Sequence, residues 1–113
     1  MHAHDITYAT HILITARKAT QAIKDVSRNH FDSNEILQFA LTHMLQIIGE
    51  AARHISKDFQ NEYSHIPWLA IIAMRHKVVH DYMNVDLDIV WETLSNDLPI
   101  LISQLEDILK MAS

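Results

Sequence analysis

The sequence predicts an all-α protein, folded as an up-down antiparallel bundle of four or five helices. Two observations support that prediction. Glycine occurs once and proline twice in 113 residues, and the apolar residues recur at spacings of three and four. So few turn-forming residues favour long helices with short connections over a sheet built from hairpins. A chain of this length typically forms one domain, so we expect residues 1–113 to be a single unit.

The first two helices follow from apolar periodicity. The first is expected over residues 5–27, followed by a polar break at 29–32. The second starts at Asp32 or Ser33 and ends near Lys57. Apolar residues cover more than one of its sides, so this second helix is either central in the bundle or shared with a second subunit.

The second half of the chain predicts two more helices. A loop is expected at 58–66, and Pro67 suits the first turn of a third helix that runs to about Val79. Asp86 is a good N-cap for a fourth helix. A proline lies inside the apolar pattern of that helix, so we expect a kink or a restart over residues 95–99.

Composition narrows the classes of function. No apolar run approaches the roughly 20 residues needed to cross a bilayer. The first ten residues lack the basic and apolar regions of a signal peptide, so we expect a cytoplasmic protein with no membrane partner. The absence of cysteine excludes disulfides and thiolate metal sites. The net charge of −5 is unlike that of a general nucleic-acid binder, so any RNA site must be a local basic patch.

The segment RHKVVHDY, residues 75–82, concentrates the reactive side chains. Arg75 and His80 are five residues apart, so on an ideal helix their side chains start about 140° apart. They can converge if the helix ends or bends near His80. A twofold-related subunit could instead complete the site with its own pair.

Arginine and histidine together suit the cleavage of RNA. Without a metal ion, a base must activate the 2′-hydroxyl and an acid must protonate the leaving 5′-oxygen. Histidine suits both proton transfers because its unperturbed pKa lies near 6.5. Arginine stays protonated, and its planar guanidinium matches the phosphate oxygens of a dianionic phosphorane. Arg75 and His80 are thus a minimal set for metal-independent cleavage, for which we expect no cofactor.

Two other interpretations of these residues stay open. An arginine and a histidine at a helix end are often solvent-exposed or C-capping residues. His76 and His80 are four apart, the spacing of helical zinc pairs. The sequence HKVVH lacks the glutamate of H-E-x-x-H, however, and no third ligand is obvious. We therefore expect no metal site.

Three blocks of the chain resemble the HepT branch of the HEPN superfamily. They are IGEAA at 48–52, IPWLAIIAMRHKVVHDY at 66–82 and DLDIVWETLSNDLPIL at 86–101, in the family's order and spacing. The family motif R-x-x-x-x-H-x-Y falls on Arg75, His80 and Tyr82. The family commonly has Gly-Met-Arg-Asn where this chain has Ala-Met-Arg-His at residues 73–76. That departure leaves the role of His76 open.

The resemblance implies a HEPN fold and an endoribonuclease toxin with Arg75 and His80 as catalytic residues. Such toxins resemble one another as homodimers whose two motifs face a common cleft, where RNA is the substrate. Their partner is an MntA-type nucleotidyltransferase antitoxin that transfers AMP to the motif tyrosine, here Tyr82. A larger hetero-oligomer with that partner stays open. His76 and Lys77 are candidate contacts to RNA phosphates.

Glu50, in the block IGEAA, is a candidate for orienting the catalytic pair. If the third helix packs on the second, its carboxylate could hold Arg75 or His80; otherwise it is a half-exposed glutamate on a helix face. Arg53, His54 and Lys57, at the end of the second helix, could extend the basic patch, and they equally suit the C-terminal dipole of that helix. The alternative function is a non-catalytic HEPN module that docks a nucleotidyltransferase.

Overall fold

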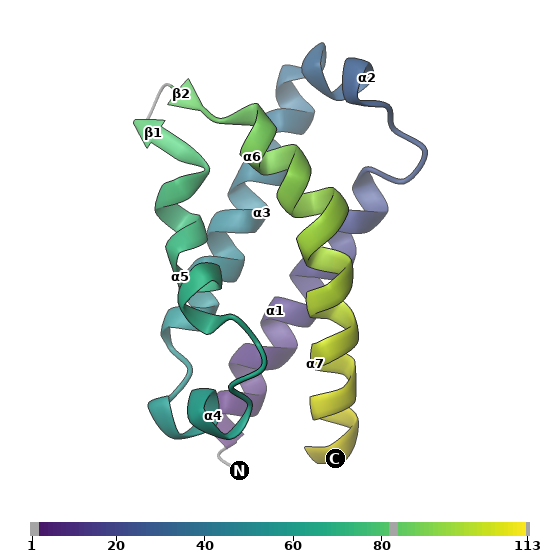
Figure 1. Cartoon of the computed structure of the whole chain (residues 1–113). Helices are drawn as coiled ribbons and strands as arrows, with labels where there is room; N and C mark the ends of the chain where they lie inside the picture. Colours follow the sequence, from purple (N-terminus) through teal and green to yellow (C-terminus); the bar gives the residue numbers. More distant parts are fainter. Residues whose placement is uncertain (1–2, 82–83, 113) are drawn as a thin grey trace.

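The computed structural model describes residues 3–81 and 84–112, without the side chains of residues 80–81 and 111–112. It confirms the all-α prediction: helices form most of the described chain and pack as an elongated bundle, to which one short hairpin is added (Figure 1). The elements, in order, are α1 (Ala3–Ala22), α2 (Arg28–Asp32), α3 (Glu35–Arg53), α4 (Lys57–Glu62), α5 (Trp68–Lys77), β1 (Val79–Asp81), β2 (Asn84–Val85), α6 (Leu87–Glu92), η1 (Thr93–Asp97) and α7 (Leu98–Ala112).

The first helix is shorter than expected, and the polar break that was to follow it is itself helical. α1 ends at Ala22, and Asp25 has a positive φ of 62°, a left-handed conformation that a helix does not continue through. Ser27 then starts α2, because its hydroxyl accepts a hydrogen bond from the His30 N–H at 3.1 Å. The prediction of an irregular segment at 29–32 was therefore wrong.

The second predicted helix corresponds to α3, with a different start. Asn34 is its N-cap, and the Asn34 side-chain oxygen accepts a hydrogen bond from the Leu37 N–H at 3.1 Å. The helix therefore begins after Asn34 instead of at Asp32 or Ser33. It ends at Arg53, before the expected end near Lys57.

The segment expected to be a loop at 58–66 contains α4, which is held to α1 by a buried carboxylate. Ser56 caps α4 by accepting a hydrogen bond from the Phe59 N–H. The Asp5 side chain is fully buried and accepts hydrogen bonds at 2.7 Å from both the backbone N–H and the hydroxyl of Ser56. Because both carboxylate oxygens are satisfied, the acid can be buried there.

After α5 the chain forms a hairpin that the sequence pattern did not predict. β1 and β2 are antiparallel, with Val79 opposite Val85 and Asp81 opposite Asn84. Asp86 follows and caps the next helix as predicted, accepting a hydrogen bond from the Ile89 N–H.

The expected kink before Pro99 is a π-helical turn that joins α6 to α7 without a break. In this turn, η1, the Leu98 N–H donates to the Thr93 carbonyl, five residues earlier. The next residue, Pro99, has no N–H to donate, so one α-helical hydrogen bond is missing there whatever the register. The change to the π-helical register falls beside this missing bond.

α3 is the central helix, packing against both α1 and α5, while α7 packs against α1 (Figure 1). One face of α3 nevertheless stays exposed and carries Ile36, Phe39 and Ile47. Both expectations for this helix, a central position in the bundle and contact with a second subunit, therefore retain support. Within the described residues no helix is long and apolar enough to span a membrane. The largest fully buried side chains are Phe31, Phe59, Ile12, Leu41, Leu45, Ile48, Ile66, Leu94, Leu98, Leu105, Val78 and Val90.

Candidate active site at the end of helix α5

Arg75 lies in the last turn of α5 and is held by a carboxylate of α3. Its Nη1 is 2.7 Å from Oε2 of Glu50, and about half of the Arg75 side chain is exposed. The structure therefore brings together two of the residues singled out in the sequence. The guanidinium is fixed at one side by Glu50 while the exposed part faces solvent, where a phosphate could bind it.

Gly49 explains why α5 comes so close to α3. A methyl group at this position would lie 3.1 Å from the Arg75 backbone nitrogen and 3.1 Å from the Ile71 carbonyl oxygen. These distances are tighter than ordinary van der Waals contacts, and the atoms concerned are backbone atoms. Glycine thus permits the helix approach that puts Glu50, the next residue, within reach of Arg75.

Glu50 also accepts hydrogen bonds from two neighbours on its own helix. Arg53 Nη2 lies 2.7 Å from Oε1, and His54 Nε2 lies 3.2 Å from the same oxygen. Hydrogen bonding to Arg53, together with the bond to His54 and the charge of Arg75, lowers the Glu50 pKa from 4.5 to about 2, although desolvation opposes the shift. The carboxylate is therefore ionised at neutral pH and accepts hydrogen bonds only.

His80 lies in a strand and not in the helix that carries Arg75. α5 ends at Lys77 and β1 begins at Val79, so the backbone changes course between the two motif residues. That end of the helix is one of the two conditions under which we expected the side chains to converge. The His80 side chain and the whole of Tyr82 lie outside the described residues, so their predicted roles stay predictions.

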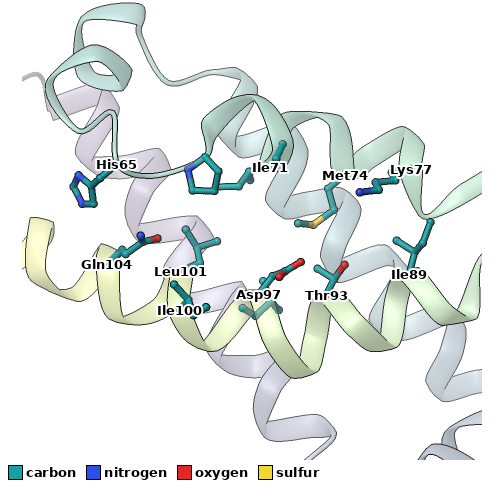
Figure 2. A pocket seen from close by; sticks show the side chains of 13 residues that line it. His65, Ile71, Met74, Lys77, Ile89, Thr93, Asp97, Ile100, Leu101 and Gln104 are labelled. Carbon is teal, nitrogen blue, oxygen red and sulfur yellow. The ribbon is translucent and has the colours of Figure 1, made fainter.

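Lys77 does not share one surface with Arg75, although both were candidate contacts to RNA. His76 is exposed. Lys77 lines a pocket of about 360 Å³ between α5 and the α6–α7 helix (Figure 2). Met74 lines the same pocket, whereas Arg75 contacts α3. Residues two apart on a helix differ in direction by about 200°, so Lys77 and Arg75 point to opposite sides of α5.

No group of three histidine, aspartate or glutamate side chains that could hold a metal ion occurs among the described residues. His76 belongs to that part of the chain, but the side chain of His80, the other member of the candidate zinc pair, does not. The expectation of no metal site therefore stays a prediction.

The sequence pattern did not predict an aromatic cluster that lies beside this site. Tyr8 of α1 stacks on His54, with ring centroids 5.1 Å apart, and also meets the rings of His4 and His11. A signal was present, because residues 4, 8 and 11 are spaced to share one helix face. What the sequence lacked was any indication that this face lies against the end of α3.

Comparisons with known proteins identify the family of this chain. The family described as "Ribonuclease HepT-like" matches residues 12–108. "Putative RNase TTE0752" of Caldanaerobacter subterraneus subsp. tengcongensis is 35% identical over 103 residues, 91% of this chain and 92% of that protein. "Probable ribonuclease HepT" of Thermococcus cleftensis is 34% identical over 87 residues, 77% of this chain and 79% of that protein.

A third relative is "Putative RNase MJ1380" of Methanocaldococcus jannaschii, which is 30% identical over 95 residues, 84% of this chain and 87% of that protein. No solved structure matches the chain at a comparable level of significance. The matched region spans α3, α5 and the motif residues between Arg75 and Tyr82. The chain therefore belongs to the HepT-like ribonuclease family.

Proposed function

We propose that this protein is a metal-independent endoribonuclease, with Arg75 and His80 as its catalytic residues, and the toxin of a toxin–antitoxin pair. The observation that supports this most is the Arg75 guanidinium, held at 2.7 Å by Glu50 at the end of a helix in a HepT-like chain. Relatives named as ribonucleases support the same activity.

The chemistry follows from the two side chains. A neutral histidine takes the proton of the RNA 2′-hydroxyl, whose oxygen attacks the adjacent phosphorus. A protonated histidine gives a proton to the departing 5′-oxygen, which leaves a 2′,3′-cyclic phosphate and a 5′-hydroxyl end. Arg75 donates hydrogen bonds to the equatorial phosphorane oxygens, where negative charge accumulates.

The need for a base and an acid favours a homodimer. One chain carries one motif histidine, and two chains related by a twofold axis supply two. The exposed face of α3 supports this assembly, because Ile36, Phe39 and Ile47 form an apolar stripe on it. Glu50 lies three residues after Ile47 on the same face, so pairing through α3 would bring both Arg75 side chains to one cleft.

The antitoxin would be an MntA-type nucleotidyltransferase that modifies Tyr82. The partner removes the phenol proton, the phenolate oxygen bonds to the α-phosphorus of ATP, and the bond from that phosphorus to pyrophosphate breaks, so that pyrophosphate leaves. Tyr82 is two residues past His80, so AMP on it adds bulk and negative charge where the RNA backbone must bind. The toxin would then be silenced without any change in its fold.

Replacing the two motif residues tests the activity. We expect Arg75→Ala and His80→Ala each to lower the rate of RNA cleavage by about 100- to 10,000-fold, because each removes one function of the transition state. Both variants should keep the far-ultraviolet circular dichroism of the parent and should no longer arrest growth. Parental rates in both variants would contradict the proposal, as would activity that EDTA abolishes and zinc restores.

Tyr82→Phe tests the control by AMP transfer. The variant should stay toxic and should escape neutralisation by transfer, since it has no phenol oxygen to accept AMP. Intact-mass spectrometry after co-expression with the cognate nucleotidyltransferase should show AMP units on the parent and none on the variant. If the partner silences an unmodified parent chain, inhibition is by binding alone and the alternative of a docking module gains support.

A further inference from the structure

A cluster of four rings covers the surface where the start of α1 meets the end of α3. The Tyr8 and His54 rings are stacked, with planes 16° apart. The Tyr8 ring meets His4 edge-on at 4.8 Å and His11 at 5.9 Å. We call these four residues the ring platform. Its three histidines are exposed and Tyr8 is half-buried, so the cluster faces solvent and is not part of the core.

The ring platform is connected to the candidate active site through one side chain. His54 Nε2 lies 3.2 Å from Oε1 of Glu50, and the other oxygen of that carboxylate holds Arg75 at 2.7 Å. Glu50 therefore links the stacked rings to the guanidinium expected to bind the scissile phosphate. A nucleotide next to that phosphate would have the ring platform within reach.

The charges around the ring platform suit an RNA strand, although the chain as a whole is acidic with a net charge of −5. Arg53 is about half exposed and lies between His54 and the Glu50 carboxylate in the chain. Two acids of the same region are already engaged: Glu50 pairs with its cations, and Asp5 is buried and accepts hydrogen bonds from Ser56. Phosphate oxygens there would meet cations and imidazoles.

We propose that the ring platform is a substrate subsite on which one unpaired base of the RNA stacks, extending the Tyr8–His54 pair by a third ring. This inference rests on the proposed ribonuclease function. His54 offers the accessible ring, since its side chain is 42% exposed, and Tyr8 supports it from behind. Bases in a duplex stack on one another, whereas an unpaired base has a free face, so the subsite selects single-stranded RNA.

Steady-state cleavage of short unstructured RNAs tests the subsite with the full-length chain. His54→Ala should raise KM about 5- to 100-fold while kcat stays within a few-fold, as expected for the loss of one stacked base. His54→Phe should restore KM because it keeps a ring, although it cannot hydrogen-bond Glu50. Tyr8→Leu should raise KM in the same direction. His30→Ala, an exposed histidine on α2, is the matched control and should change nothing.

A series of RNAs with a single abasic position separates stacking from a structural role. For the parent, removing the base at one position of the RNA should raise KM. With that RNA, His54→Ala should raise KM no further. If His54→Phe is as defective as His54→Ala, or if the losses multiply at every position, the rings only fasten α1 to α3 and the inference is wrong. Normal RNA kinetics with lost binding to the nucleotidyltransferase would make this a protein-docking surface instead. A parent chain that neither binds nor cuts RNA would contradict the ribonuclease proposal, and this inference with it.

Discussion

Glu50 holds three side chains with one carboxylate, and this shapes how Arg75 can act. Its two oxygens receive hydrogen bonds from Arg75, Arg53 and His54. Because the pKa of Glu50 is depressed from 4.5 to about 2, the stability that these contacts contribute is fully present above about pH 4.5. That stability is lost as the pH falls through about 2. Titration of Glu50 therefore does not shape the pH dependence of cleavage near neutrality.

Removing that charge should impair cleavage by releasing Arg75. We expect Glu50→Gln to lower kcat by about 10- to 100-fold, because a small misplacement of a transition-state contact is costly. KM should not rise, since a freed guanidinium still attracts phosphate. The matched control is Glu106→Gln, which removes an equally short, exposed pair with Arg17 at 2.7 Å. Equal kcat values for Glu50→Gln and the parent would show that Arg75 needs no such support.

At the level of residues, the sequence predicted one contact within the candidate site but not the direction of every side chain. Arg75 and Glu50 were both identified, and the structure places them in contact. Lys77 was grouped with Arg75 because the two are close in sequence, but it lies in the pocket on the other side of α5. Tyr8 was missed, because its contact with His54 joins residues 46 positions apart, and no local pattern reports such a contact.

At the level of elements, the approach of α5 to α3 depends on the only glycine of the chain. We expect Gly49→Ala to lower the free energy of unfolding by about 1 kcal/mol, which urea titration would measure. Alanine favours the helix by a similar amount, but its methyl group would press on the backbone of α5, which can yield only by moving as a whole.

The same substitution should reduce RNA cleavage, because a displaced α5 carries Arg75 away from Glu50. Ser103→Ala, at an exposed position of α7, should leave both stability and cleavage unchanged and serves as the control. A Gly49→Ala variant that is more stable than the parent and equally active would mean that the two helices have room for the methyl group.

The long helices were predictable from periodicity, whereas the short elements were not. α2 and α4 have five and six residues, less than two full turns, so no repeating apolar pattern can mark them. They exist because Ser27 and Ser56 supply N-caps, and α4 is also held by Asp5 from 51 residues away. The hairpin of β1 and β2 depends on backbone pairing between segments too short to show strand alternation.

At the level of the whole molecule, the bundle is flat, with principal extents of 43 × 29 × 19 Å, and it leaves an apolar stripe on its central helix. Ile36 is 82% exposed and Phe39 58% exposed, both on α3. Such a stripe beside a candidate active site is typical of an interface. It supports pairing through α3 more than through α7, where Ile100 is an isolated exposed side chain.

We expect a dimer at micromolar concentration in sedimentation velocity, and we expect Phe39→Glu to produce monomers that cleave RNA at least about 100-fold more slowly, because each then lacks its second histidine. Ile100→Glu introduces the same charge at an exposed position of α7 and should leave the dimer intact. A monomeric parent that cuts RNA at full rate would remove the shared cleft from the mechanism.

The π-helical turn at Thr93–Asp97 also sets how α7 is rotated about its axis relative to α6. A turn of this kind holds one residue more than an α-helical turn, and one residue corresponds to about 100° of rotation. Deleting a residue from it would turn the buried side chains Leu101, Leu105 and Ile108 out of the core together. The extra residue thus changes the rotation of α7 about its axis. One continuous helix can then turn an apolar face both to the motif-bearing half of the chain and to the N-terminal helix.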